Sequence, residues 1–61
     1  MDKNAVSYRV CLIVMAYQDG MISRDECVER LELLRVRGAF RTDNSYIGYD
    51  YGTQQWVEVA A

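Results

Sequence analysis

The side chains best suited to catalysis or metal binding are three carboxylates and two thiols. Asp43, Asp50 and Glu58 could meet across a small sheet and act as a general acid and base. Cys11 and Cys27 could bind zinc, but two thiolates without histidine leave zinc short of ligands. The chain contains no histidine, so the commonest general base is missing as well. We therefore expect no enzyme activity, no cofactor and no metal site.

The segment from Asp19 to Glu26 resembles the second half of an EF-hand loop, with Gly20 at the sharp turn. Calcium takes about six to eight oxygen ligands, some of them from the first and third loop positions. Here those positions are Met15 and Tyr17, which carry no carboxylate. A simpler interpretation is that one helix stops, the chain turns, and a second helix begins.

The chain is one small domain, residues 1–61, because a chain of this length has room for a single core. Its apolar fraction of 51% predicts a folded protein. Both cysteines lie in apolar segments, so we expect buried free thiols in a reducing compartment; a bridge stays possible if two helices pack side by side. The opening residues Met1–Asn4 are not typical of a signal peptide, which favours a cytoplasmic location.

A first helix is expected over residues 4–18. One face of it would carry apolar residues at helical spacing, namely Val6, Val10, Ile13, Val14 and Tyr17. Asp2 or Asn4 could cap its start, and Gly20 could end it. The run from Val10 to Tyr17 is apolar on every side, so it must be covered from more than one direction. It is too short to cross a bilayer, which takes about 20 apolar residues.

A second helix is expected over residues 23–37. Ser23 and Glu26 have the spacing of a capping box, in which each side chain bonds the other residue's backbone N–H. Arg35 and Arg37 suit the negative end of the helix dipole, and Gly38 would end the helix. A connection of about four residues makes the two helices antiparallel neighbours.

Residues 39–59 are expected to form a hairpin or three-stranded meander, with strands near 39–42, 45–51 and 54–59. The fold class is therefore α+β, an antiparallel helical hairpin packed on a small antiparallel sheet in the order ααβββ. Alternation places Tyr49 and Tyr51 on one face of the middle strand, where they could complete the core. It sends Tyr46 and Asp50 to the other face, where we also expect Trp56 of the last strand.

The segment from Leu34 to Phe40, followed by a hairpin, resembles the end of a winged-helix domain. That resemblance implies DNA binding through Arg35, Arg37 and Arg41. Winged-helix domains have a third helix that this sequence lacks, and the formal net charge of −2 opposes phosphate contacts. Nucleic-acid binding is therefore the alternative hypothesis.

Aromatic residues are concentrated near the C-terminus, and tyrosine and tryptophan are enriched at protein interfaces. We expect a protein-binding surface made of Tyr46, Tyr49, Asp50, Tyr51, Trp56 and Glu58. The main hypothesis is a non-enzymatic binding module, of the kind encoded by phages and mobile elements to inhibit a host complex by steric occlusion, as anti-CRISPR proteins do. A homodimer is expected to cover the rest of the apolar helix. A structural subunit of a larger assembly is a further alternative.

Overall fold

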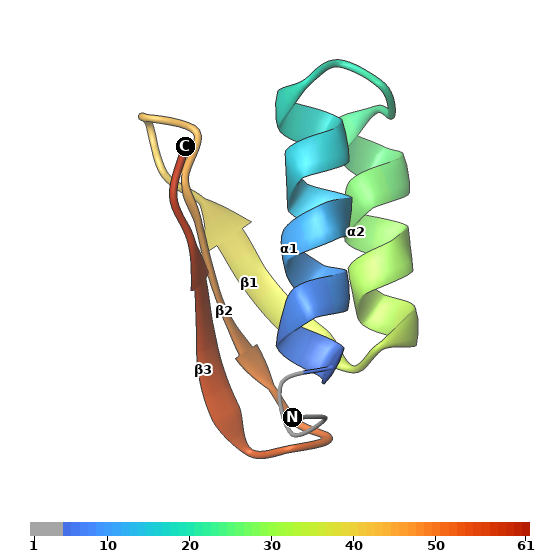
Figure 1. The fold of residues 1–61 in the computed structure, drawn as a ribbon, viewed down its shortest axis with the longest axis vertical. Coiled ribbons are helices and arrows are strands. Elements are labelled where there is room, and N and C mark those ends of the chain that lie inside the picture. Colours follow the sequence, from blue (N-terminus) through green and yellow to red (C-terminus); the bar gives the residue numbers. More distant parts are fainter. Residues whose placement is uncertain (1–4) are drawn as a thin grey trace.

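The structure is a computed structural model that describes residues 5–61, with side chains from Tyr8 onward. It confirms the α+β class and the order ααβββ (Figure 1). The elements are α1 (Ala5–Gln18), α2 (Arg24–Leu33), β1 (Val36–Phe40), β2 (Tyr46–Asp50) and β3 (Gln55–Val59).

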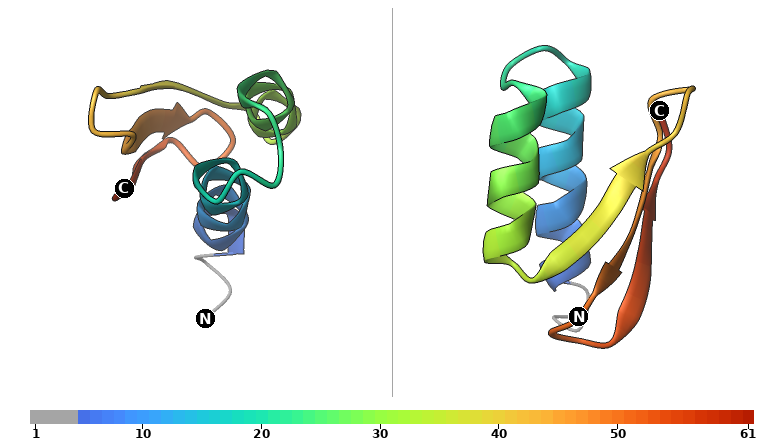
Figure 2. Two further views of the ribbon diagram at one scale, coloured as in Figure 1. Left: turned by 90° about the horizontal axis from the view of Figure 1, so that it is seen from above. Right: turned by 180° about the vertical axis from the view of Figure 1, so that it is seen from behind.

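The molecule has two layers, a pair of antiparallel helices and a three-stranded antiparallel sheet in the order β1-β2-β3. Both helices lie on the same face of the sheet, so its other face is uncovered (Figure 2). Among the described residues, the core consists of buried side chains from both helices and all three strands: Val10, Val14, Cys27, Leu31, Val36, Tyr46, Val57 and Val59.

Helix α1 buries only part of its apolar run. Val10 and Val14 are fully buried, as the helical spacing predicts, while Leu12 and Met15 remain 48% and 45% exposed. Helix α2 and the sheet therefore cover one side of α1 and leave another side open. The predicted caps Asp2 and Asn4, and the side chain of Val6, lie outside the described residues.

Helix α2 begins where the sequence predicts it. The backbone N–H of Glu26 donates to Ser23 Oγ at 3.1 Å, and the N–H of Ser23 donates to Glu26 Oε1 at 2.9 Å. The predicted end at residue 37 is wrong, because α2 ends at Leu33. Arg35, with φ of 62°, takes the left-handed position that we assigned to Gly38. Its carbonyl accepts the N–H of Tyr51 at 2.9 Å, so pairing with the distant β2 end stops the helix early.

Strand β1 consequently starts at Val36, three residues before the predicted start at residue 39. Gly38 lies in the middle of β1 and pairs with Gly48 of β2. A Cβ at Gly38 would collide with the backbone of Ile47 and Gly48, and one at Gly48 would lie 2.7 Å from the Tyr46 hydroxyl. The two glycines therefore allow the strands and the Tyr46 ring to approach closely.

The strand alternation is confirmed, but the inward face of β2 is the reverse of the expected one. Tyr46 and Asp50 are 2% and 1% exposed and face the helices. The Tyr46 ring packs edge-on against Phe40, with centroids 5.1 Å apart, and Phe40 in turn contacts Tyr17 of α1 at 4.7 Å. Tyr46 thus has the core position that we expected for Tyr49 and Tyr51.

Candidate functional site: the uncovered sheet face

The sheet face opposite the helices is the clearest candidate surface, and we call it the outer face. Cross-strand partners share a face, and the register aligns Arg37 with Tyr49 and Tyr49 with Trp56. The next row in the same orientation joins Ala39, Ile47 and Glu58. The outer face therefore comprises Arg37, Ala39, Ile47, Tyr49, Trp56 and Glu58, with Tyr51 beyond the end of β2.

Three aromatic rings form a continuous cluster on this face. The Tyr49 ring lies edge-on to Trp56, with centroids 5.2 Å apart, and edge-on to Tyr51 at 5.0 Å. Trp56 is 72% exposed and Tyr51 is 60% exposed. The two exposed rings are held in place by a common neighbour, although most of their area faces solvent.

The structure divides the predicted interface residues between the two faces. Tyr49, Tyr51, Trp56 and Glu58 lie on the outer side, where a partner could reach them. Tyr46 and Asp50 are buried under the helices, so they do not belong to an accessible surface. The period of two correctly separated Tyr49 and Tyr51 from Tyr46 and Asp50, but it did not indicate which pair faces inward. The face expected for Trp56 was wrong, because the β2–β3 register pairs Trp56 with Tyr49 on the outer face.

Asp50 has a structural role at the turn between β2 and β3. Its Oδ1 accepts the backbone N–H groups of Gly52 and Thr53 at 2.9 and 3.2 Å. Its Oδ2 is buried and has no hydrogen-bond partner among the described residues. A buried carboxylate oxygen without a partner is costly, so the turn hydrogen bonds must offset that cost.

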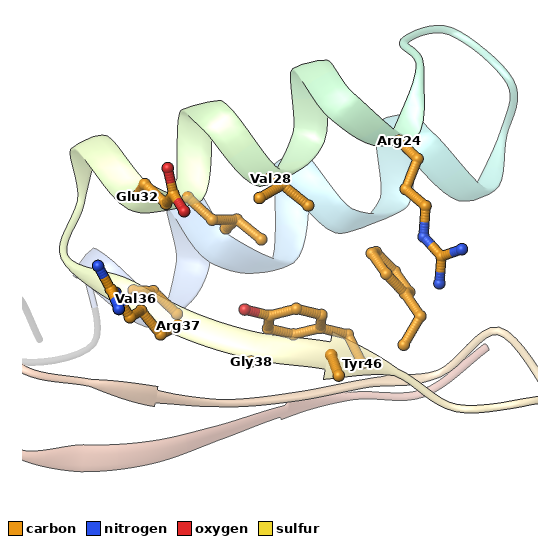
Figure 3. A pocket seen from close by; sticks show the side chains of 10 residues that line it. Arg24, Val28, Glu32, Val36, Arg37, Gly38 and Tyr46 are labelled. Atoms are coloured by element: carbon orange, nitrogen blue, oxygen red, sulfur yellow. The ribbon is translucent and has the colours of Figure 1, made fainter.

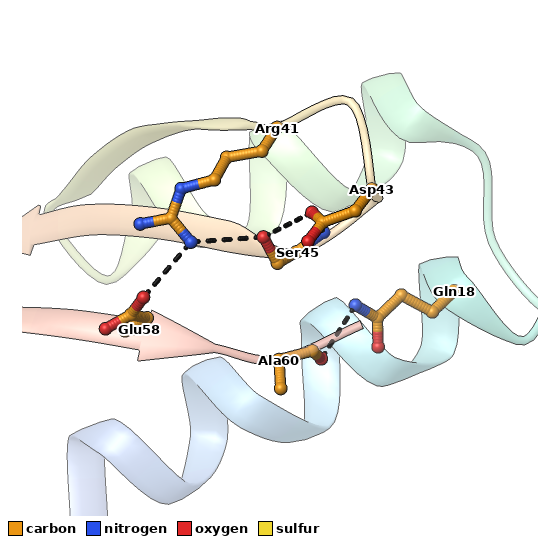
Figure 4. Close-up of polar contacts among 6 residues, drawn as sticks. All are labelled: Gln18, Arg41, Asp43, Ser45, Glu58 and Ala60. Atoms are coloured by element: carbon orange, nitrogen blue, oxygen red, sulfur yellow. Dashed lines mark hydrogen bonds and ion pairs between the residues drawn. The ribbon is translucent and has the colours of Figure 1, made fainter.

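Asp43, Asp50 and Glu58 do not form a catalytic cluster. Glu58 forms an ion pair with Arg41 at 3.1 Å, and the Arg41 guanidinium also donates to Ser45 Oγ at 3.1 Å (Figure 4). The Ser45 hydroxyl donates to Asp43 Oδ1 at 2.6 Å. Hydrogen bonds from the Ser45 hydroxyl and backbone N–H, with the Arg41 charge, hold the pKa of Asp43 below its ordinary value.

Gln18, at the end of α1, joins the helical layer to the end of the sheet that carries the β1–β2 turn. Its side-chain amide donates to the carbonyls of Asn44 and Ala60 at 2.8 and 3.1 Å; the bond to Ala60 is drawn in Figure 4. The β1–β2 turn and the residue after β3 are therefore both joined to the helical layer. The polar groups here hold segments together.

The arginines of the DNA-binding hypothesis do not lie on a recognition helix. Arg35 follows the end of α2, Arg37 lies in β1, and Arg41 follows β1. The Arg41 charge is already paired with Glu58. The described part of the chain has two helices, as the sequence predicts, so the third helix of a winged-helix domain is not found there.

Both cysteines are free thiols, as expected. Cys27 is buried, and its thiol donates weakly to the Ile13 carbonyl at 3.8 Å. Burial raises the pKa of the Cys27 thiol, which keeps it protonated and unreactive. Between residues 5 and 61 no group of three potential metal ligands comes together.

A cleft of about 400 Å³ lies between α2 and β1, and no pattern in the amino-acid sequence indicates it. Val28 and Leu31 of α2 line one side, and Phe40 and Tyr46 line the other (Figure 3). The Arg24 guanidinium lies 5.3 Å above the Phe40 ring. The early end of α2 sets the position of β1 relative to the helix, and no local sequence signal predicts that spacing.

Comparison with known proteins identifies no relative. The chain matches no protein-family model, no curated protein and no solved structure. Neither helix of the described chain is long and apolar enough to span a membrane. The function must therefore be argued from the two surfaces described above.

Proposed function

We propose that this chain is a non-enzymatic protein-binding module whose outer face contacts the partner. The observation that carries this proposal is Trp56, which is 72% exposed yet packed edge-on against Tyr49. A solvent-exposed tryptophan contributes little to the core of its own domain, so its apolar area is available to a partner. Tryptophan and tyrosine are the residues that most often dominate binding energy at protein interfaces.

The geometry of the cluster supports binding by a preformed surface. Tyr49 contacts both exposed rings, so Trp56 and Tyr51 lose little conformational freedom when a partner covers them. Arg37 and Glu58 flank the aromatic cluster on the same face. An apolar centre with charged residues at its edge is the usual composition of a protein interface.

The proposal extends to the mode of action. A small domain with an exposed aromatic face can act by covering a surface that another macromolecule needs. We therefore propose that the chain is a cytoplasmic inhibitor of a host complex, encoded by a phage or mobile element and acting by steric occlusion, as anti-CRISPR proteins do.

The first test compares Trp56→Ala with Met21→Ala in quantitative affinity capture from a host lysate. Met21 is 78% exposed in the turn between the helices, so it is a matched control for loss of an exposed apolar side chain. We expect a specific partner to be retained by wild type and Met21→Ala and reduced at least about tenfold for Trp56→Ala. Circular dichroism should show the same helix content in all three proteins.

A second measurement reports directly on Trp56, the single tryptophan of the chain. Labelling with 5-fluorotryptophan gives one fluorine resonance, which should shift or broaden when the captured partner is added. A partner that binds without changing this resonance, or that binds Trp56→Ala as tightly as wild type, would contradict the proposal. Binding to duplex DNA that weakens steeply with salt would favour the winged-helix alternative instead.

We also propose that a second copy covers the apolar side of the helical layer. A groove of about 360 Å³ between α1 and α2 is lined mainly by Leu12, Ile13, Leu33 and Leu34, and Leu33 is 80% exposed. Glu29 lies one helical turn before Leu33 on α2, while Arg9 and Arg30 line the groove itself. A symmetric pair could therefore bring acids of one copy to arginines of the other.

A further inference from the structure

Strand β1 is an edge strand with a free row of backbone groups. Among the described residues its only strand neighbour is β2. Arg41 N–H donates to the Ser45 carbonyl, and the Arg35 carbonyl accepts from Tyr51 N–H. Hydrogen-bonded pairs alternate along an antiparallel ladder, so the odd-numbered residues of β1 bond to β2. The N–H and C=O groups of Val36, Gly38 and Phe40 therefore point away from the sheet.

The cleft between α2 and β1 lies beside this free edge. Val36, Gly38 and Phe40, which carry the outward backbone groups, also line the cleft. Val28 on α2 is 40% exposed and faces the cleft across from Tyr46 (Figure 3). An extended segment that paired with β1 would place every second side chain against this apolar lining.

The charge around the edge is strongly positive, although the whole chain is acidic. Four of the seven basic residues of the chain lie in or beside β1 or on the rim of the cleft, namely Arg24, Arg35, Arg37 and Arg41. Arg41 is paired with Glu58, and Glu32 is the single acid among the lining residues of the cleft. The remaining positive charge favours a ligand with carboxylates.

We propose that the β1 edge and the α2–β1 cleft form a binding site for an extended acidic peptide segment of another protein. The segment adds a fourth strand beside β1. Its apolar side chains enter the cleft between Val28 and Tyr46, and its alternating carboxylates point to the other side of the sheet, near Arg37. Backbone hydrogen bonds supply affinity, and the alternating side chains supply selectivity. This site shares Arg37 with the outer face, but it is built on the free edge of β1 and the cleft and does not involve Trp56, so it does not depend on the proposed function.

A second copy of the chain fits this edge less well. Antiparallel pairing of two β1 strands would bring Arg35, Arg37 and Arg41 of each copy towards those of the other. Like charges facing each other across paired strands are destabilising, and arginine or lysine on an edge strand commonly prevents such association. The same charges attract a segment of opposite sign.

The test uses the whole chain of residues 1–61 and a synthetic peptide, blocked at both ends, that alternates leucine with glutamate over six residues. Hydrogen exchange of backbone amides is followed by nuclear magnetic resonance during the titration. We expect the amides of Val36, Gly38 and Phe40 to exchange at least about tenfold more slowly when peptide is bound, because each gains a hydrogen bond. The amides of Arg37 and Ala39 already bond to β2 and should change little.

Two control peptides separate backbone pairing from simple charge attraction. A peptide with lysine in place of glutamate should bind at least about tenfold more weakly. A peptide N-methylated at its leucine amides and one N-methylated at its glutamate amides should differ in affinity. Only one edge of the added strand faces β1, so only one of the two sets of amides donates hydrogen bonds to β1. Loss of binding with N-methyl leucine would indicate antiparallel pairing.

Variants of the protein complete the test. Arg37→Glu reverses the charge beside the carboxylates of the peptide, and we expect it to weaken peptide binding about tenfold. Arg9→Glu makes the same change on α1 and should bind as wild type does. The proposal is overturned if millimolar peptide leaves exchange at the β1 edge unchanged, or if Arg9→Glu weakens binding as much as Arg37→Glu. It is also overturned if the edge amides become protected with rising protein concentration in the absence of peptide, since a second copy would then occupy the site.

Discussion

At the scale of single residues, the polar groups of this protein hold segments together. Ser45 is 4% exposed, and its hydroxyl accepts from Arg41 while donating to Asp43. These contacts join the β1–β2 turn to Glu58 on β3 through the Arg41 guanidinium. The ionised carboxylate of Asp43 accepts these hydrogen bonds more strongly than its protonated form does, so the strength of the arrangement depends on pH.

Asp43→Asn should make stability less sensitive to acid. The hydrogen bonds from Ser45 lower the pKa of Asp43 in the folded state, so the stabilisation is complete above the ordinary carboxyl pKa of about 4 and is lost as pH falls through the lowered pKa. The asparagine amide oxygen can still accept from Ser45 but does not titrate in this range. The free energy of unfolding, measured in urea at pH 7 and at pH 2.5, should therefore change less between the two pH values for Asp43→Asn than for wild type. Equal differences in the two proteins would show that the Asp43 charge does not contribute.

At the scale of elements, features that depend on local contacts were predicted from the sequence, and features that depend on long-range contacts were not. The start of α2 depends on Ser23 and Glu26, which lie three residues apart, and the sequence located it correctly. The end of α2 depends on pairing between Arg35 and Tyr51, and the inward face of β2 depends on the packing of Tyr46 against Phe40. Those contacts join residues that a local pattern treats as independent, so the boundary at 37 and the burial of Tyr46 were missed. The α2–β1 cleft was missed for the same reason.

Ser23→Ala should destabilise the protein by about 0.5–2 kcal/mol, because the N–H of Glu26 loses its acceptor. Ser23→Asp restores an acceptor at the same position and should recover most of this loss. Thermal unfolding followed by circular dichroism measures both effects. If Ser23→Ala unfolds at the wild-type temperature, the capping box does not stabilise α2.

At the scale of the whole molecule, the two layers leave apolar area uncovered on both sides. The helical layer exposes Leu12 and Leu33, and the sheet exposes Tyr51 and Trp56. A domain of 61 residues has too little chain to cover both faces of a two-layer structure. The sequence indicated this through the apolar run from Val10 to Tyr17, although it did not show which side chains would remain exposed.

Leu33→Lys should convert a dimer to a monomer if a second copy covers the groove between the helices. Leu33 is 80% exposed, so the substitution should leave the monomer fold intact, and a charge in the centre of an apolar contact should weaken association at least about tenfold. Met21→Lys is the control, since Met21 is equally exposed at the turn. Sedimentation equilibrium over a wide concentration range measures the effect. A wild-type protein that stays monomeric at millimolar concentration would rule out the dimer.

The pairing of Gly38 with Gly48 determines how far this chain can be redesigned. Any larger residue at Gly38 would meet the backbone of β2, and a side chain at Gly48 would displace the Tyr46 ring. Libraries intended to alter specificity can therefore vary Ala39, Ile47 and Trp56 freely, while both glycine codons must be kept fixed. Deep mutational scanning should find that Gly38 and Gly48 tolerate no substitution, whereas Ala39, Ile47 and Trp56 tolerate many.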